Sequence, residues 1–308
     1  MVKGFLGYPR EGNGLASWDM FPKLNPPLSD GQITKAIEKA FERATKNKEG
    51  DVIEQPDSAK ALVELCLKHL RDRTDPILTT SFYANVKAEE VFEMDAIPHE
   101  MQRHRMKLGS FYQFLLEELI TIASDQVDSP FMVNATGGPR EGDVIAYMEP
   151  DSFKKGLKLY ISVKKSGDTI GGQDKAGAVR RLEQVAKEDQ SRTSPYLCVF
   201  AIMTPKGKVA KYKADRKMLR DNKKRLVSNF SEDWGPGFVY PFVTGRSAYD
   251  IYNEAGKVVE DYFPFYSVRF KEEASDLLKR ELIKRGIANK AGEVITDQLF
   301  RYITREID

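Results

Sequence analysis

The sequence has few of the residues that build disulfide frameworks or soft metal sites. It contains two cysteines and three histidines in 308 residues, and Cys66 and Cys198 lie far apart. Two distant cysteines cannot form a zinc cluster by themselves, and their scarcity is typical of a protein in a reducing cytoplasm. The histidines, His69, His99 and His104, share no metal-ligand spacing. A disulfide-framed scaffold is therefore excluded.

Long apolar runs are also missing. No segment approaches the roughly 18 apolar residues of a membrane-spanning helix, and residues 1–9 lack the apolar core of a signal peptide. We therefore expect a cytoplasmic protein with no membrane segment. No Walker loop or nucleophile elbow is present, which argues against nucleotide phosphotransferases and serine hydrolases. Hydrophobic residues make up 41% and charged residues 31% of the chain, a balance typical of globular proteins.

The spacing of apolar and turn residues predicts an α-rich first part and a mixed second part. Helices are expected at 29–47, from Ser58 onward, and at 89–97, 99–124, 174–189, 248–253 and 272–285. Strands are expected at 143–149, 157–164 and 196–203. The aromatic segment 234–245 is expected to be loop-like, and its aromatic residues to lie in the core rather than at a subunit interface.

The first two predicted strands bring an acid, a hydroxyl and a base together. A Pro-Asp turn signal separates strand 143–149 from strand 157–164, which favours a hairpin. Symmetric pairing puts Asp143 opposite Lys164, and opposed residues share a face. Asp143, Ser162 and Lys164 then project together from the open end of the hairpin. An ordinary cross-strand ion pair is the alternative explanation.

The surroundings of this hairpin carry a resemblance to a known family. Gly137, Gly138 and Gly142 lead into Asp143, and Ser162-Val-Lys is followed by glycines, a predicted helix and a predicted strand. This pattern resembles the PD-(D/E)XK nuclease superfamily, and within it the type II restriction endonucleases. There, an Asp on one strand and an (Asp/Glu)-X-Lys on its antiparallel neighbour form a magnesium-dependent site. The resemblance spans 108–203, about a third of the chain.

The resemblance implies a role for each matching residue. Asp143 would bind Mg²⁺, Lys164 would orient or activate the attacking water, and the carbonyl of Val163 would be a further metal ligand. Ser162 stands where the superfamily has a carboxylate. Some members with Ser-X-Lys supply the missing carboxylate from the following helix, and members often add a glutamate from the preceding one.

Two glutamates are candidates for the missing metal ligand. On a helical wheel, Glu183 falls inside the apolar stripe of helix 174–189. In helix 99–124, Glu118 borders the apolar face and Glu117 points to water. The alternative for both Glu118 and Glu183 is a glutamate at the edge of an apolar stripe, paired with a Lys or Arg.

Positive charge is concentrated in one segment. Residues 206–225 hold ten basic and two acidic residues, a local net of +8, which leaves −6 for the rest of a chain whose total is +2. This segment is either a solvated face or a polyanion-binding patch. The basic cluster 103–107 could contact phosphates or simply be a solvated helix start. Candidate DNA-binding residues are Arg103, His104, Arg105, Lys107, Lys165, Lys223, Lys224 and Arg225.

Together these features predict an α/β nuclease core, a mixed sheet flanked by helices. Its expected divisions are an α-rich portion at 1–106, the catalytic core at 107–205 and a portion at 206–308 that completes DNA binding or dimerisation, all in one compact domain. The resemblance implies a Mg²⁺-dependent type II restriction endonuclease that acts as a homodimer on double-stranded DNA beside a cognate methyltransferase. The alternatives are a repair or recombination nuclease and a non-catalytic DNA-binding protein on a decayed nuclease scaffold.

Overall fold

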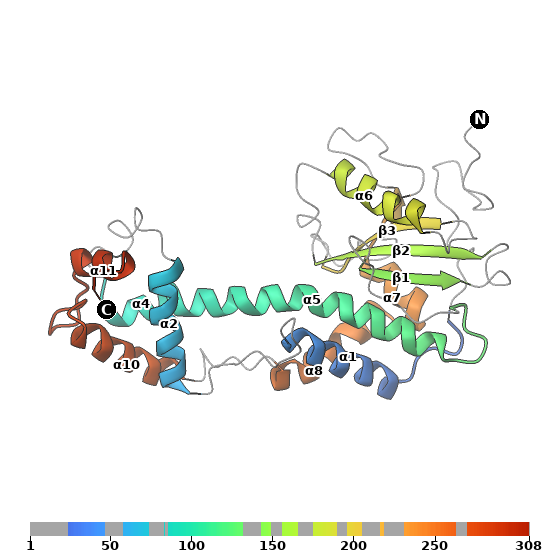
Figure 1. The fold of residues 1–308 in the computed structure, drawn as a ribbon. Coiled ribbons are helices and arrows are strands. Elements are labelled where there is room, and N and C mark those ends of the chain that lie inside the picture. Colours follow the sequence, from blue (N-terminus) through green and yellow to red (C-terminus); the bar gives the residue numbers. More distant parts are fainter. Residues whose placement is uncertain are drawn as a thin grey trace. The chain divides into compact units, whose positions relative to one another are not determined.

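A computed structural model shows a mixed α/β protein (Figure 1). It describes residues 24–46, 58–73, 83, 86–131, 143–148, 156–165, 175–189, 196–204, 216–218, 231–262 and 270–307. The helices are α1 (Asp30–Thr45), α2 (Ala59–Arg73), α4 (Ala88–Val91), the π-helical η2 (Phe92–Ala96), α5 (Ile97–Ser124), α6 (Lys175–Glu188), α7 (Pro236–Thr244), α8 (Ala248–Tyr262), α10 (Lys271–Lys284) and α11 (Thr296–Ile303). The strands are β1 (Val144–Met148), β2 (Leu157–Lys164), β3 (Tyr196–Ile202), β4 (Arg216–Met218) and β5 (Ser231–Trp234). None of the described helices is both long and apolar enough to span a membrane.

The chain forms two compact units rather than three consecutive portions. The first unit comprises Met1–Thr45 and Leu108–Tyr262, and the second comprises Lys46–Lys107 and Phe263–Asp308. Each unit is therefore built from two separate stretches of chain. A division by sequence position at 106 and 205 cannot anticipate this, because composition alone does not show which distant segments pack together.

Side-chain caps begin the first two helices where the sequence predicts them. Ser29 Oγ accepts the Gln32 N–H at 3.3 Å, and Gln32 Oε1 accepts the Ser29 N–H at 2.9 Å. This reciprocal pair is a capping box that satisfies N–H groups with no partner inside the helix. Ser58 Oγ accepts the Ala61 N–H at 3.3 Å in the same way, just before α2.

The sheet is mixed, with strand order β1-β2-β3-β5-β4. β1 and β2 are antiparallel, whereas β2, β3 and β5 run parallel to one another, and β4 is antiparallel to β5. The helix α6 lies between the parallel strands β2 and β3 in the chain, as the crossover of a βαβ unit does. The carboxyl ends of β2, β3 and β5 therefore lie at the same edge of the sheet as the start of β1.

The hairpin register differs from the symmetric pairing by two residues. Val144 pairs with Ile161, and Met148 pairs with Leu157 as the last pair. The predicted register would have paired Pro150 with Leu157, and proline has no N–H to give to a strand ladder. Because side chains alternate with a period of two, a two-residue shift leaves every side chain on its predicted face.

Helices cover both faces of the sheet (Figure 1). On one face, Val179, Leu182 and Ala186 of α6 pack against β2 and β3 through Tyr160 and Phe200. On the other, Trp234 at the end of β5 packs edge-on against the rings of two α7 residues, with centroid distances of 4.7 and 5.6 Å. The aromatic segment is thus core, as expected.

The expectation of a loop at 234–245 was wrong, because α7 occupies most of it. Gly235 is the N-cap, Pro236 is the first helical residue, and Gly245 ends the helix with a left-handed φ of 70°. Proline at the start and glycine at the end are helix boundary signals. The interior Pro241 and the many aromatics obscured them, and burial of the aromatic side chains overrides their weak helix propensity.

In the second unit, α2, α4, α10 and α11 share a hydrophobic core. Leu278 and Leu282 of α10 are completely buried in it. Leu277 and Ile283 are partly buried and pack against the same core. These four side chains therefore contribute to the core of one chain.

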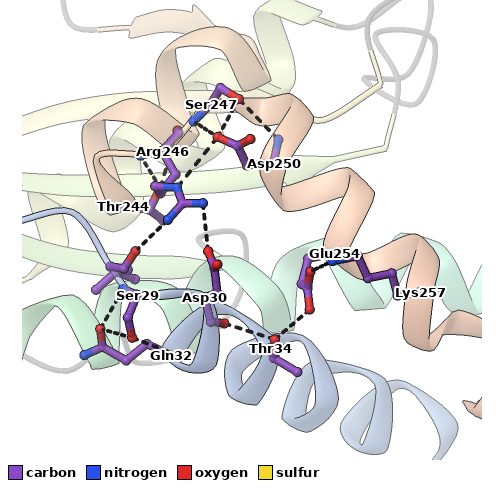
Figure 2. A network of polar contacts seen from close by, with 11 residues as sticks. Ser29, Asp30, Gln32, Thr34, Thr244, Arg246, Ser247, Asp250, Glu254 and Lys257 are labelled. Carbon is purple, nitrogen blue, oxygen red and sulfur yellow. Dashed lines mark hydrogen bonds and ion pairs between the residues drawn. The ribbon is translucent and has the colours of Figure 1, made fainter.

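Polar contacts fix α1 against α8 in the first unit (Figure 2). The Arg246 guanidinium lies 2.8 Å from Asp30 Oδ1. Thr34 Oγ1 donates a hydrogen bond of 2.8 Å to Glu254 Oε1. These contacts link the first turns of α1 to the α7–α8 segment and so orient the whole helix, including its last turn.

Candidate active site

Asp143 lies at the open end of the β1–β2 hairpin, one residue before β1. Its Oδ2 accepts a hydrogen bond of 2.6 Å from the Val163 N–H and one of 3.2 Å from Ser162 Oγ. Extending the observed register by one step puts Asp143 opposite Ser162. The strand pairing itself therefore delivers this carboxylate to the end of β2.

Lys164 completes the group expected from the sequence. Its Nζ lies 3.7 Å from Asp143 Oδ2, and the side chains of Lys164 and Asp143 are 29% and 26% exposed. A partly exposed ion pair contributes at most about 1 kcal/mol to stability. Both charged groups remain in reach of a solvent-borne ion or phosphate. The structure thus brings Asp143, Ser162 and Lys164 together.

The backbone of Val163 also faces this group. The N–H and C=O of one strand residue point to the same side of the strand. Since the Val163 N–H reaches Asp143, its carbonyl oxygen faces the same edge. The carbonyl that the resemblance implies as a metal ligand is therefore on the Asp143 side of β2.

The end of β2 is held from its other side by β3. The Met203 N–H donates to the Lys164 carbonyl at 2.9 Å, and the Thr204 N–H donates to the Lys165 carbonyl at 2.7 Å. The hydroxyl of Tyr252 in α8 donates to the carbonyl of Met203. The backbone that presents Lys164 is therefore tied to both the sheet and α8.

Gln113 of α5 connects the group to a second carboxylate. Its Nε2 donates to the Asp143 backbone carbonyl at 3.4 Å and to Glu117 Oε1 at 3.0 Å. Because both oxygens accept from the same nitrogen, Glu117 Oε1 lies close to the Asp143 carbonyl oxygen. Glu117 is buried, with only 4% of the residue exposed. A buried carboxylate that lies close to the backbone of Asp143 is thus available from the preceding helix.

The expectation that Glu117 points to water was wrong. Glu117 lies outside the apolar stripe of α5, but α1 packs against that side and buries it. No local pattern in the sequence signals this contact. Arg43 of α1 packs there, and its guanidinium lies 4.2 Å from the centre of the Phe114 ring.

Arg43 holds both adjacent glutamates of α5. Its Nη2 lies 2.5 Å from Glu117 Oε2, and its Nη1 lies 2.9 Å from Glu118 Oε1. Lys39 Nζ lies 3.6 Å from the other oxygen of Glu118. The contacts of Glu118 described here are therefore with α1, whereas Glu117 contacts both α1 and Gln113. Arg43 and Gln113 belong to no local motif and could not be predicted from the sequence.

The structure does not bring Glu183 beside Asp143. Glu183 Oε1 accepts a hydrogen bond of 3.2 Å from Ser231 Oγ of β5. In the order β1-β2-β3-β5, Ser231 is three strands from β1. At roughly 4.8 Å per strand spacing, the backbones of Ser231 and of β1 are on the order of 14 Å apart. A serine hydroxyl is thus one polar partner of this carboxylate in the apolar stripe.

The expected DNA-binding residues are placed only in part. Arg103, His104, Arg105 and Lys107 lie on α5 in the second unit, but their side chains are outside the described part of the structure. Lys165 directly follows β2. Lys223, Lys224 and Arg225 lie outside the described residues.

Comparisons with protein-family models and with curated protein sequences find no match for this chain. Within the described residues, His, Cys, Asp and Glu side chains form no group of three or more that could hold a metal ion. Function is therefore inferred from the geometry of Asp143, Ser162, Lys164, Gln113 and Glu117.

Proposed function

We propose that this protein is a Mg²⁺-dependent nuclease with a PD-(D/E)XK-like core, and specifically a type II restriction endonuclease acting on double-stranded DNA. One observation carries the proposal. Asp143 and Lys164 meet at the open end of an antiparallel hairpin whose second strand leads through α6 into a parallel strand. This is the arrangement implied by the resemblance noted in the sequence.

The oxygen donors present fit a magnesium ion. Mg²⁺ prefers oxygen ligands and is commonly bound by one or two carboxylates, with water and substrate phosphate completing its shell. Asp143 and the Val163 carbonyl would supply two ligands, and Glu117 is the carboxylate on the preceding helix that would supply a third. The contacts of Asp143 described above all reach Oδ2, which leaves Oδ1 for a metal. A bound Mg²⁺ would stabilise negative charge on the phosphate and lower the pKa of a coordinated water.

The protein groups around this position have separable roles. Lys164 presents a positive charge beside Asp143, where it can orient a water or a phosphate oxygen. Ser162 donates to Asp143 Oδ2 and thereby fixes the carboxylate rotamer. Ser162 is a neutral residue where a carboxylate would be expected, so Glu117 is the candidate replacement in our proposal. Glu117 is preferred because Gln113 links its side chain to the Asp143 backbone, whereas the contacts described for Glu118 and Glu183 lead to α1 and to Ser231.

The charge distribution supports a polyanionic substrate. The segment 206–225, with a local net of +8, would contact DNA phosphates in a manner independent of sequence. Cutting a duplex means cutting two strands of opposite polarity, and a two-fold homodimer supplies one catalytic centre to each strand, so we propose such a dimer on a palindromic site. A methyltransferase that protects the same site would be the functional partner of such an enzyme.

The test is digestion of plasmid DNA by the full chain with and without Mg²⁺, followed by sequencing of the DNA ends. Discrete fragments that require Mg²⁺ and end at one sequence would support the proposal. Nicks that follow DNA structure would indicate a repair or recombination nuclease instead. A mobility shift without cutting would indicate a non-catalytic DNA-binding protein.

A matched pair of variants locates the activity. Asp143→Asn keeps an oxygen acceptor for Ser162 and Val163 but removes the charge, and it should abolish cutting. Asp189→Asn changes an aspartate at the other end of the same sheet face, where Lys158 and Tyr160 contact it at 2.5 Å. The Asp189 variant should cut normally, and loss of cutting only in this variant would place the site elsewhere.

A further inference from the structure

Arg43 lies outside the segment that resembles nucleases, yet it contacts the carboxylates nearest to the proposed metal site. Its two terminal nitrogens reach Glu117 Oε2 and Glu118 Oε1 at 2.5 and 2.9 Å. Such a fork is specific to arginine, because its guanidinium is planar and donates in fixed directions.

We propose that Arg43 is a positioning residue that orients Glu117 for divalent-metal binding, so that α1 sets the metal affinity of the site. This inference rests on the proposed function, because it requires Glu117 to take part in metal binding. Arg43 itself would touch neither metal nor substrate.

Both oxygens of Glu117 are held in defined directions. Oε2 is bound by Arg43 at 2.5 Å, and Oε1 by Gln113 at 3.0 Å. Gln113 donates with the same nitrogen to the backbone carbonyl of Asp143. The chain Arg43, Glu117, Gln113, Asp143 is therefore continuous from α1 to the hairpin. Partners that hydrogen-bond a ligand in this way commonly tune the affinity of a metal site.

Charge explains why Glu117 depends on Arg43. The Glu117 side chain is only 5% exposed, and an unpaired carboxylate is costly to bury. Its neighbour Glu118 carries the same charge but is 15% exposed and is also reached by Lys39. Without Arg43, two adjacent carboxylates would repel each other, and Glu117 would have no cation among the contacts described here. Its carboxylate would then leave the orientation that Gln113 and Asp143 define.

Arg43 is itself held firmly enough to act as a positioning group. Its guanidinium lies over the Phe114 ring at 4.2 Å from the centroid. Near the other end of α1, Arg246 pairs with Asp30, and Thr34 donates to Glu254 (Figure 2). The helix that carries Arg43 is thus anchored to α8, in the same unit as the hairpin.

The experiment measures Mn²⁺ binding to the full chain by electron paramagnetic resonance or calorimetry, without DNA. We expect Arg43→Ala to weaken Mn²⁺ binding by about 10- to 100-fold. Arg43→Lys should weaken it less, because an ammonium can still neutralise Glu117 but cannot bridge both glutamates. The matched control is Lys39→Ala, which removes a cation from the same helix that contacts Glu118 but not Glu117. It should leave the Mn²⁺ affinity within about twofold, since Glu117 keeps both of its contacts.

Each outcome bears on a different statement. Circular dichroism checks folding, and if Arg43→Ala does not fold, the Arg43→Lys variant decides the question. Unchanged or tighter Mn²⁺ binding in the folded variant would overturn the role of Arg43. Absence of Mn²⁺ binding in the wild type would overturn the metal site together with this inference. Weakened binding in the Arg43 variants of a protein that cuts no DNA would support the role of Arg43 and overturn only the nuclease assignment.

Discussion

Ser162 Oγ donates a hydrogen bond of 3.2 Å to Asp143 Oδ2 across the open end of the hairpin. Ser162 is almost completely buried, so this hydroxyl is a fixed donor rather than a solvent-exposed one. It occupies the position where the nuclease pattern has a carboxylate. The hairpin therefore supplies one negative charge instead of two. A metal site built here needs a carboxylate from another element, and Glu117 of α5 meets that need best among the three glutamates considered.

Replacing Lys164 should stop catalysis without preventing DNA binding. We expect Lys164→Ala to slow cleavage by at least about 10²-fold, because it removes the positive charge beside Asp143. The affinity for DNA should stay within a few-fold, measured by mobility shift in Ca²⁺. Lys158→Ala is the control, since Lys158 lies on the same strand and face and pairs with Asp189 at 2.5 Å. Near-normal cleavage by the Lys164 variant would contradict the site assignment.

Three Glu→Gln variants distinguish the candidate carboxylates. Glu117→Gln should raise the Mg²⁺ concentration needed for half-maximal cleavage by more than about tenfold, or abolish cleavage. Glu118→Gln and Glu183→Gln should leave this requirement within about threefold, because the contacts described for them lead to α1 and Ser231 and not to Asp143. The measurement is initial cleavage rate against Mg²⁺ concentration. A Mg²⁺ requirement that changes only in the Glu183 variant would return the second ligand to α6.

Much of the local structure could be predicted from the sequence, because its signals are local. The Ser29 cap, the apolar stripe of α6 and the alternating burial of β1 each depend on neighbouring residues. The predicted hairpin register was wrong by two residues, yet the structure still brings Asp143, Ser162 and Lys164 together. A period of two makes the choice of face insensitive to such a shift.

What could not be predicted depends on distant packing. Glu117 is buried because α1, more than 70 residues earlier, packs against that side of α5. The helix α7 forms from a segment with weak helix propensity because its aromatic rings pack against Trp234. In both cases the deciding partner lies far away in the sequence or on another element, so no local pattern contains it.

The end of α7 offers a test of the fold that is independent of catalysis. Gly245 has φ 70°, and a Cβ there would lie 2.9 Å from Pro27 Cα. Gly245→Ala should lower the free energy of unfolding by about 1–3 kcal/mol, through left-handed strain and this clash. Gly256→Ala, in the middle of α8 with no atom within 4 Å of its Cβ position, should raise it by about 0.5–1 kcal/mol. Denaturant unfolding measures both, and equal effects would contradict the α7 boundary.

The basic segment 206–225 should determine how strongly DNA binding depends on salt. Replacing Lys223, Lys224 and Arg225 together by Ala should weaken binding to specific and random DNA alike. It should also reduce the slope of log affinity against log salt by roughly 0.9 for each DNA phosphate that the variant no longer neutralises.

The control is a triple variant with the same change in net charge at Lys60, Lys284 and Arg301. These cations are exposed on helices and lie within 4.0 Å of Glu64, Glu281 and Asp297, so their surroundings are locally neutral. Affinities measured at several salt concentrations should give a smaller slope for the first variant and an unchanged slope for the control. Equal slopes in both variants would assign the basic segment to a solvated face that does not contact DNA.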